Sequence, residues 1–408
     1  MLTVEEALGA ILSRVEPLGA ERVELLAALG RVLAEPIVAR RAVPPWPASS
    51  MDGYALRAAD TRDGGVDLAV VGRVAAGSLP RRALGRGEAM RIFTGAPLPE
   101  GADAVVPQED VAAEGDRVRV AARVARGACV RPAGEDVRAG DLVLEPGHAL
   151  GPAEVGLLAT LGHARVAVGR RPRVAILSTG NELADLGTEP GPGQIANTNT
   201  YSLLAQVREA GGEALNLGVA PDRLEAIEAR VRAGMAADVL VSSAGVSVGE
   251  LDLVREALAR AGAELHLWQV AMRPGKPITF GSLGGRPVFG LPGNPVSAMV
   301  TFELFVRPAL RKLAGARALE RPRVRARALA PIANPGARRG YLRVTLHREA
   351  GGLGARLTGD QGSAILRSMV AADGLAVVPG DTRVAAGEEL EVILLRPLEP
   401  RAADTERS

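Results

Sequence analysis

Lysine is rare in this chain, and one of its lysines lies in a stiff turn. Of the 49 basic residues only Lys276 and Lys312 are lysines, and Lys276 belongs to Arg273-Pro274-Gly275-Lys276-Pro277. An ammonium group is compact and has three rotatable donors, whereas a guanidinium is a wide planar fork. A tight turn that holds a small oxyanion favours the ammonium, so Lys276 is a candidate anion-binding residue. The alternative is a lysine without a special role, which is how we interpret Lys312 near the end of an expected helix.

Other loops combine glycine with polar side chains in the same way. They are Ser178-Thr179-Gly180-Asn181-Glu182, residues 245–249, and Leu291-Pro292-Gly293-Asn294-Pro295-Val296-Ser297. Glycine lets backbone N–H groups approach a ligand, and the helix N-terminus that follows adds donors and positive potential. These loops predict a site for phosphate or another oxyanion. Asn294 before Pro295 is also a good helix N-cap, an interpretation that requires no ligand.

Carboxylates occur in the same loops. Glu182 and Asp252 would repel an anionic ligand unless a cation lay between them, and Mg²⁺ bound by carboxylates and phosphate oxygens resolves that conflict. The alternative is that both are ordinary loop acids. A zinc site is not expected, because the single cysteine, Cys129, and four scattered histidines show no metal-ligand spacing. The sequence also lacks a Walker loop and a dinucleotide-binding GxGxxG motif, so the expected fold alone does not indicate an ATPase or a dehydrogenase.

The elements that must position these loops fall into several segments. Apolar residues at helical spacing predict helices in residues 1–45 and near 152–161, and short strands broken by Gly and Pro fill 47–145. We therefore expect a helical linker domain (1–46 and 146–170) with an inserted β domain (47–145). In 171–316, continuous apolar strands at 174–177, 214–217, 239–242, 265–270 and 288–289 alternate with helices near 199–211, 222–234, 250–261 and 294–313.

That alternation predicts a doubly wound, mostly parallel sheet, which binds ligands in the loops at the carboxyl ends of its strands. Strands return in residues 317–400 and predict a small C-terminal β-barrel, followed by a tail at 401–408. The expected fold class is a multidomain protein that combines α/β and all-β domains.

Composition excludes several classes of function. The chain is 47% hydrophobic and 24% charged, which is typical of a soluble globular protein, and its net charge is only +2. It therefore has no overall field that would attract nucleic acid or an anionic membrane. Residues 1–19 do not resemble a signal peptide, and no apolar run approaches the length of about 20 residues that spans a bilayer. We expect a cytoplasmic protein with neither nucleic acid nor a membrane as its partner.

Taken together, the motifs resemble a known family. S-MDGYA, TGAPLPEGADAVVPQED, GED, STGNEL, GQI-NTN, GVSVG--D, RPGKP and GLPGNPVSA occur in this order. Over residues 1–400 the chain resembles the molybdopterin molybdenumtransferase family, which is related to the C-terminal domain of gephyrin. The resemblance implies a homodimer of four-domain subunits whose α/β domain is similar to the molybdopterin-binding fold. Its active cleft would lie between this domain and the β domain of the partner subunit.

The implied reaction inserts molybdate into adenylylated molybdopterin, with Mg²⁺-dependent release of AMP, and the molybdopterin adenylyltransferase is an implied further partner. The resemblance assigns catalytic roles to Asp52, Thr94, Asp136, Asp222, Asp252 and Lys276. It assigns Mg²⁺ to Glu182 and Asp252. It assigns molybdate or adenylylated molybdopterin to Gly245, Ser247, Arg273, Lys276, Asn294, Ser297, Arg343 and Ser363.

The chain departs from the family pattern at a few positions. Ala244 replaces a glycine, Arg273 stands where many members have lysine, and Pro47-Ala48 replaces Asp-Asn ahead of Asp52. Two other functions are weighed against the transferase. A molybdopterin adenylyltransferase uses the same α/β fold, but it would not need the flanking β domains. A non-enzymatic scaffold of the gephyrin type would not need Asp52, Glu182, Asp252 and Lys276.

Overall fold

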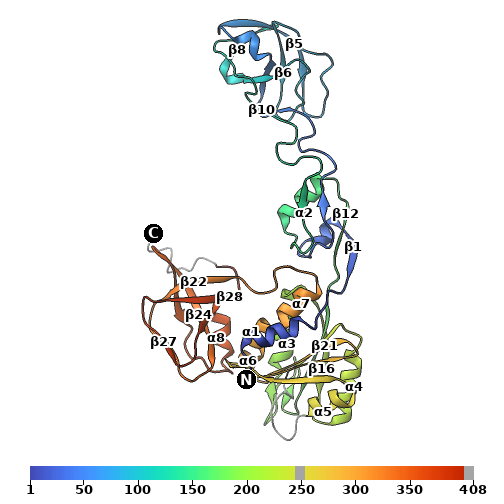
Figure 1. Cartoon of the computed structure of the whole chain (residues 1–408), viewed down its shortest axis with the longest axis vertical. Helices are drawn as coiled ribbons and strands as arrows, with labels where there is room; N and C mark the ends of the chain where they lie inside the picture. The colour runs from blue at the N-terminus through green and yellow to red at the C-terminus, as the bar shows by residue number, and fades with distance from the viewer. Residues whose placement is uncertain (244–252, 399–408) are drawn as a thin grey trace. The chain divides into compact units, whose positions relative to one another are not determined.

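The computed structural model describes residues 1–243 and 253–398 and divides the chain into two compact units (Figure 1). The larger unit comprises residues 1–34, 146–151 and 166–408, and the smaller one comprises 35–145 and 152–165. Gly245, Ser247 and Asp252, three of the predicted site residues, lie outside the described residues, as does the expected tail.

The smaller unit is built on a six-stranded sheet in the order β7-β4-β6-β5-β9-β8. The strands are β4 (Gly53–Leu56), β5 (Val66–Val74), β6 (Glu88–Ile92), β7 (Ala104–Pro107), β8 (Val111–Glu114) and β9 (Arg117–Val120). In β9, Val118 and Val120 are buried while Arg117 and Arg119 are exposed, as the alternation of side chains along a strand requires.

Short elements complete this unit. They are the paired strands β2 (Ile37–Val38) and β11 (Leu142–Leu144), the pair β3 (Ala48–Ser49) and β10 (Val130–Arg131), and helix α2 (Pro152–Thr160). The strands expected in residues 47–145 thus lie in this unit, which also includes residues 35–46 and 152–165.

A six-stranded α/β sheet forms the centre of the larger unit, in the order β16-β13-β17-β21-β20-β18. Its strands are β13 (Arg173–Thr179), β16 (Glu213–Ala220), β17 (Val239–Ser243), β18 (Glu264–Gln269), β20 (Pro277–Leu283) and β21 (Arg286–Leu291). Four adjacent strands are parallel, and β20 is antiparallel to both of its neighbours. The mostly parallel sheet is confirmed, whereas β20 was not among the expected strands.

Apolar cores cover both faces of this sheet, which explains its continuous apolar strands. In β13, Val174 and Ile176 join one buried cluster, and Ala175 and Leu177 join another. The helices are α3 (Thr198–Glu209), α4 (Leu224–Gly234), α5 (Leu253–Arg260), α6 (Pro295–Thr301) and α7 (Arg307–Leu313). The single helix expected over 294–313 contains a π-helical turn, Phe302–Val306, between α6 and α7. Pro308 lies just after it, and because proline has no N–H it cannot continue the regular ladder.

The N-terminal helix is shorter than expected. Helix α1 (Val4–Leu12) begins with a capping box between Thr3 and Glu6 and buries one face in the core that contains α7. After Leu12 the chain turns through Pro17 and Gly19, the latter with a φ of 89°. It continues as β1 (Ala20–Glu24), which pairs with β12 (Arg165–Gly169). A 3-10 turn follows β1. The apolar spacing past Leu12 resembles a helix, but proline and glycine end it.

A closed five-stranded barrel completes the larger unit. Its strands are β22 (Arg323–Ala328), β24 (Arg339–Glu349), β25 (Gly352–Leu357), β26 (Gly374–Val378) and β28 (Glu389–Leu394). The pairing of β24 with β26 closes the ring, and helix α8 (Leu366–Ala371) follows the loop after β25. One further strand, β19 (Met272–Arg273), pairs in parallel with the start of β24. This pairing attaches the Lys276 turn to the barrel.

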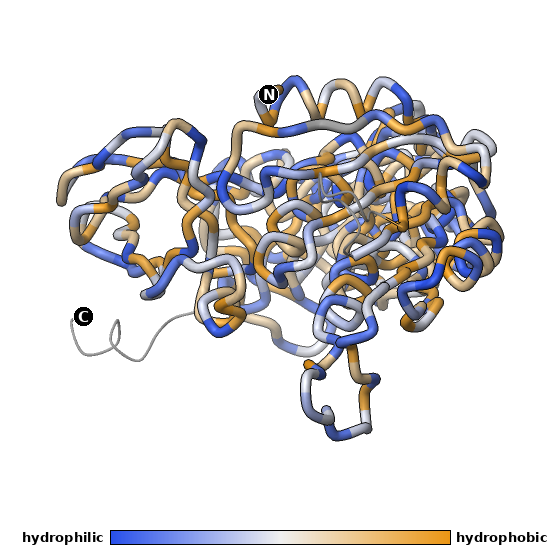
Figure 2. Tube along the Cα trace, turned by 90° about the horizontal axis from the view of Figure 1, so that it is seen from below, coloured by the Kyte–Doolittle hydropathy of each residue, from blue (hydrophilic) through white to orange (hydrophobic). Residues whose placement is uncertain are grey.

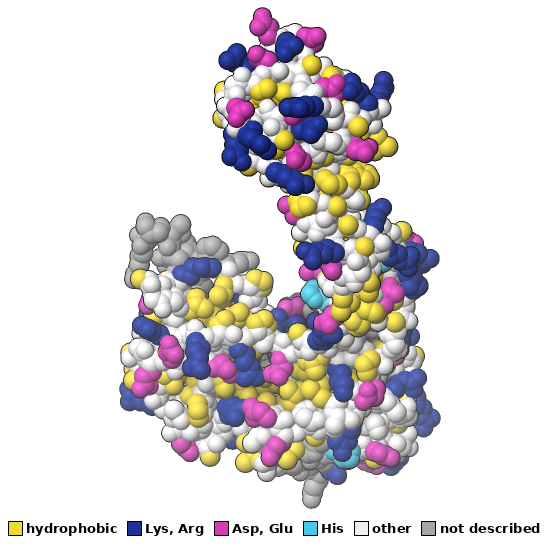
Figure 3. All heavy atoms as spheres, turned by 45° about the horizontal axis from the view of Figure 1, so that its top comes forward, with side chains coloured by type: hydrophobic (Ala, Val, Ile, Leu, Met, Phe, Trp, Pro, Cys, Tyr) yellow, Lys and Arg dark blue, Asp and Glu magenta, His cyan; other side chains and the backbone are white. Residues whose placement is uncertain are grey.

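Hydrophobic and hydrophilic stretches alternate along the chain (Figure 2). The face of the molecule in Figure 3 carries side chains of both charges, and the acidic and basic ones are interspersed. Among the described residues, none of the helices has the length and apolar character needed to cross a membrane.

Candidate functional site

A pocket of about 420 Å³ surrounds the Lys276 turn. Its walls come from the turn between β19 and β20, the first turn of α6, the residue before β24 and the loop before α8. The lining residues are Arg273, Pro274, Gly275, Lys276, Pro277, Ser297, Arg338, Gln361, Gly362 and Ser363. The structure thus brings together four predicted residues that are up to 90 positions apart: Arg273, Lys276, Ser297 and Ser363.

Among the described residues, the charged side chains that line this pocket are all positive. Arg273, Lys276 and Arg338 line it, and the lining includes no aspartate or glutamate. Within residues 1–243 and 253–398, none of these three cations forms a salt bridge. A pocket whose described charged lining residues are three cations without a salt bridge attracts a small anion.

The Lys276 turn itself is tightly constrained. The Val270 N–H donates to the Lys276 carbonyl at 2.9 Å and closes the turn. Gly275 has a φ of 98°, and a Cβ built on it would lie 2.4 Å from the buried Oγ1 of Thr301. Only glycine fits there, so the sequence pattern Pro-Gly-Lys-Pro has a steric reason.

Asn294 does not cap α6 with its side chain, although it occupies the N-cap position. Its Nδ2 donates instead to the Ser363 Oγ at 2.9 Å, and the Val296 N–H donates to the Ser363 carbonyl at 3.0 Å. The simple capping interpretation is therefore wrong for the side chain. Asn294 fastens the loop of Ser363 to the start of α6.

Arg343 lies behind the pocket and does not line it. The residue is fully buried; its Nε donates to the Ser368 Oγ at 3.0 Å and its NH2 donates to the Gly362 carbonyl at 3.0 Å. Gln361 completes the clamp, since its Oε1 accepts from the Arg343 N–H at 2.8 Å and its Nε2 donates to the Arg343 carbonyl at 3.2 Å. In this structure Arg343 positions the loop that carries Ser363.

Burial lowers the pKa of Arg343 to about 10; Asp360 opposes this lowering and Arg273 adds to it. Its NH1 is buried and has no hydrogen-bond partner among the described residues. This buried cation adds positive charge just behind the three cations of the pocket.

The carboxylates at the carboxyl ends of β13 and β16 are exposed. Asn181 and Asp222 exchange two hydrogen bonds, from the Asn181 N–H to Asp222 Oδ2 at 3.1 Å and from the Asp222 N–H to Asn181 Oδ1 at 3.2 Å. The Glu182 carboxylate folds over Gly180, where an added Cβ would lie 2.5 Å from its Oε2. No cluster of three metal-binding side chains is found in the part of the chain that the structure describes.

Sequence reasoning missed a group of buried hydroxyls at this edge of the sheet. The Ser178 Oγ lies 2.6 Å from the Thr200 Oγ1 and 2.8 Å from the Ser243 Oγ, which joins β13, β17 and α3. Asn199 donates from Nδ2 to the Gly293 carbonyl at 2.7 Å. The Asn-Thr-Asn segment at 197–199 was a usable signal, because small polar residues there open a helix beside the site.

The smaller unit holds the second group of predicted residues. Asp52 Oδ1 accepts from the Thr94 N–H and from the Thr94 Oγ1, both at 2.8 Å. These bonds, the backbone bond first, lower the pKa of the Asp52 carboxyl, and the charge of Arg91 adds to the effect. Asp52 is therefore held in place despite the Pro47-Ala48 departure. Asp136 is exposed on a separate loop, whose Asp136 N–H donates to the Val43 carbonyl at 3.0 Å.

Arginine and aromatic side chains that were not predicted lie beside Asp52. The Arg91 guanidinium stands 5.0 Å from the centre of the Phe93 ring and 5.1 Å from that of Tyr54. Arg73 lies 4.5 Å from the Phe93 ring centre. These cation–π contacts fix Arg91 beside the carboxylate.

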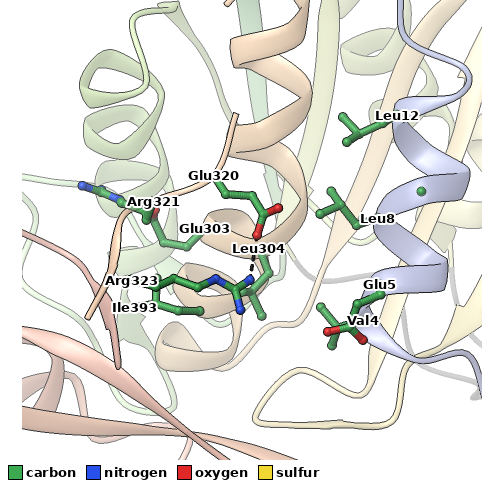
Figure 4. Close-up of a pocket in the computed structure, with 11 residues that line it drawn as sticks. Val4, Glu5, Leu8, Leu12, Glu303, Leu304, Glu320, Arg321, Arg323 and Ile393 are labelled. Carbon is green, nitrogen blue, oxygen red and sulfur yellow. Dashed lines mark hydrogen bonds and ion pairs between the residues drawn. The ribbon is translucent and has the colours of Figure 1, made fainter. Parts of the chain in front are cut away.

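A different hollow, shown in Figure 4, separates α1 from the π-helical turn and β28. One wall is apolar, with Val4, Leu8 and Leu12 from α1. Its charged groups are already paired: Arg323 with Glu320 at 2.7 Å and Arg321 with Glu303 at 2.8 Å. Because its positive charges are compensated, this hollow is not a comparable anion site.

Family models match nearly the whole chain. Residues 2–162 match the MoeA N-terminal region (domain I and II), residues 175–312 a probable molybdopterin binding domain, and residues 325–395 the MoeA C-terminal region (domain IV).

Individual relatives agree with these matches. The molybdopterin molybdenumtransferase of Nostoc sp. is 39% identical over 386 residues, with 92% of this chain and 88% of that protein covered. The enzyme of the same name from Haemophilus influenzae is 35% identical, with 96% and 98% covered. The crystal structure of the molybdopterin biosynthesis moeA protein from Pyrococcus horikoshii is 32% identical, with 97% and 100% covered and a TM-score of 0.84. The chain belongs to the molybdopterin molybdenumtransferase family.

Proposed function

We propose that this protein inserts molybdate into adenylylated molybdopterin, cleaving the pyrophosphate bond and releasing AMP, to give the molybdenum cofactor. The observation that carries the proposal is the pocket of Arg273, Lys276 and Arg338, which is of a size for a small oxyanion and whose described lining residues include no acid. Family membership supports molybdenum as the metal of the anion and molybdopterin as the pterin.

The residues suit a reaction at a pyrophosphate. Such chemistry needs charge neutralised and groups aligned more than it needs a covalent nucleophile. Lys276 and Arg273 would hold the tetraoxo anion, with Ser297 and Ser363 as hydroxyl donors from α6 and the following loop. Asp52 is ionised and anchored by Thr94, so it would present a fixed carboxylate to the substrate.

Mg²⁺ belongs to the same proposal. Carboxylate oxygens are the ligands that Mg²⁺ prefers, and the exposed Glu182 carboxylate has no lysine or arginine partner in residues 1–243 and 253–398, which fits a metal ligand. Glu182 would hold the ion together with Asp252. When bound, the ion supplies positive charge beside the phosphate oxygens.

The assembly and location complete the proposal. We propose a homodimer, with the molybdopterin adenylyltransferase as a further partner that delivers the adenylylated substrate. The cytoplasmic location expected from the sequence is part of the same proposal.

A reconstitution assay tests this function. The protein is incubated with adenylylated molybdopterin and either molybdate or tungstate, with and without Mg²⁺, and AMP and cofactor are measured. We expect AMP release to require the oxyanion and Mg²⁺, and Asp252→Ala to bind the adenylylated pterin without releasing AMP. Normal AMP release from Asp252→Ala would contradict the assignment of that residue.

The same assay separates the two alternatives. Pyrophosphate formed from molybdopterin and ATP would indicate an adenylyltransferase instead. Binding of the adenylylated pterin without turnover under any of these conditions would indicate a scaffold.

A further inference from the structure

We propose that Arg338 is a third cationic ligand of the oxyanion, and that it binds from the barrel side of the pocket. This inference rests on the proposed function and adds a binding residue that the sequence motifs do not include. The ligand class is a tetrahedral oxyanion, which is either free molybdate or a phosphate group of the pterin substrate.

The position of Arg338 is set by the junction of the barrel with the α/β domain. Arg338 immediately precedes β24, whose first residues Arg339 and Gly340 pair with Met272 and Arg273 of β19. The Arg338 NH1 donates to the Met272 carbonyl at 3.3 Å. The guanidinium therefore lies beside the backbone that leads into the Lys276 turn, although 62 residues separate Arg338 from Lys276.

The buried side chain of Asn334 holds the backbone that carries Arg338. Asn334 is buried, and its Nδ2 donates to the Arg338 carbonyl at 2.8 Å and to the Pro379 carbonyl at 3.0 Å. A Cβ built on Gly340 would lie 2.9 Å from the Asn334 Cγ, so the loop is closely packed. A side chain on such a fixed backbone loses little further freedom when it binds a ligand.

Within the described residues Arg338 forms no salt bridge, in contrast to its neighbour Arg339. Arg339 forms an ion pair with Glu5 and faces a different hollow, which Thr3, Val4 and Gly380 also line. Arg338 is half-buried in the pocket, and the acceptor that it reaches within residues 1–243 and 253–398 is the neutral Met272 carbonyl. Partly buried charges are usually paired, so an anion is the partner that this geometry lacks.

The two kinds of cation have complementary roles. A guanidinium binds two oxygens of a tetraoxo anion with parallel N–H groups, whereas the Lys276 ammonium approaches as a compact point charge. With one donor of Arg338 directed to Met272, the others remain for the anion. Arg338 would thus fix the orientation of the anion between the turn and the barrel.

The adjacent Arg339 supplies a matched control. Arg338→Ala and Arg339→Ala remove the same charge one position apart, but only the first changes the pocket. Binding of molybdate and of inorganic phosphate is measured separately by calorimetry on the full chain, and the rise in Tm with each anion provides a second readout. Lys276→Ala serves as the reference for the site, and Arg338→Lys keeps the charge but removes the fork.

We expect Arg338→Ala to weaken anion binding about ten- to a hundredfold, Arg338→Lys less, and Arg339→Ala by less than about twofold. The anion whose affinity falls further in Arg338→Ala shows which oxyanion Arg338 binds: molybdate, or a phosphate group of the pterin substrate. Equal anion affinities in Arg338→Ala and Arg339→Ala, together with a loss of affinity in Lys276→Ala, would overturn the inference about Arg338. The proposed function would then still stand. If Lys276→Ala also bound normally, or the parent bound neither anion, the anion site of the proposed function would fail as well.

Discussion

At the scale of single residues, the two lysines have opposite environments. Lys312 donates to the Leu12 carbonyl at 2.8 Å and lies 4.0 Å from a Glu16 carboxylate oxygen, so it fastens α7 to the end of α1. Lys276 has no such carboxylate partner in the described part of the chain and lines a positively charged pocket. Lys276 therefore stays a predicted anion ligand, and the rigid turn around it is what distinguishes its environment from that of Lys312.

The pairing of Asp52 with Thr94 predicts a pH-dependent contribution to stability. The pKa of the folded Asp52 carboxyl lies below its ordinary value of 3.8. The two hydrogen bonds therefore stabilise the folded state above that value, and this contribution is lost as pH falls through the lowered pKa. Thr94→Val removes the hydroxyl donor and keeps the backbone donor, so we expect a Tm deficit at pH 7 that shrinks at pH 3.

The control for this prediction is the same substitution in an Asp52→Asn background, which has no carboxylate to titrate. There the effect of Thr94→Val on Tm should be the same at both pH values. A deficit in the parent background that did not change between pH 7 and pH 3 would show that the hydroxyl acts by packing instead.

At the scale of elements, the sequence predicts best what depends on local pattern. The continuous apolar strands at 174–177 and 239–242 predicted β13 and β17, because strands buried on both faces have no polar side. The loop after β13 therefore begins at the carboxyl edge of the sheet, as expected, whereas the loop after β17 lies outside the described residues. By contrast, Arg338 and Gln361 were missed, since they reach the pocket only through the pairing of β19 with β24.

Asn294 and Arg343 show a second limit of sequence reasoning. Asn294 stands where a helix cap is expected, and its sequence context cannot reveal that its amide reaches Ser363, 69 residues away. Arg343 has the residue type of an anion ligand, and its burial and its bonds to the Ser363 loop, which the sequence could not indicate, give it a positioning role as well. Long-range contacts of this kind depend on how the barrel packs against the α/β domain, which no local pattern records.

The turn between β19 and β20 predicts a steric requirement for Gly275. Gly275→Ala would place a Cβ 2.4 Å from the Thr301 Oγ1 at a φ of 98°, so the turn must shift. Gly285, in the β20–β21 turn, has a φ of 77° with nothing within 4 Å, and Gly285→Ala is the matched control. We expect both to lower the free energy of unfolding by about 1 kcal/mol or more, the first by more.

Only Gly275→Ala should also weaken molybdate binding, because it displaces Lys276. Denaturant unfolding and molybdate titration of both variants check this prediction. Equal molybdate affinity in the two variants would mean that the tight turn is not needed to hold the anion.

At the scale of the whole molecule, the predicted residues belong to two compact units of the chain. Asp52 and Thr94 lie in the smaller unit, and the Lys276 pocket lies in the larger one. The resemblance implies that the subunits of a homodimer share each active site, with Asp52 of one subunit acting with the partner subunit's Lys276. If the sites are shared in this way, two variants that are each inactive should restore activity when they are combined in one dimer.

Mixed dimers of two inactive variants test the arrangement. Asp52→Ala and Lys276→Ala should each abolish cofactor formation as homodimers. In a heterodimer isolated with two affinity tags, a shared site would concentrate both changes in one cleft and leave the other cleft intact. We therefore expect about half of the parent activity. If each site were built within one subunit, every site in the heterodimer would carry one change, and the mixture would be as inactive as either variant alone.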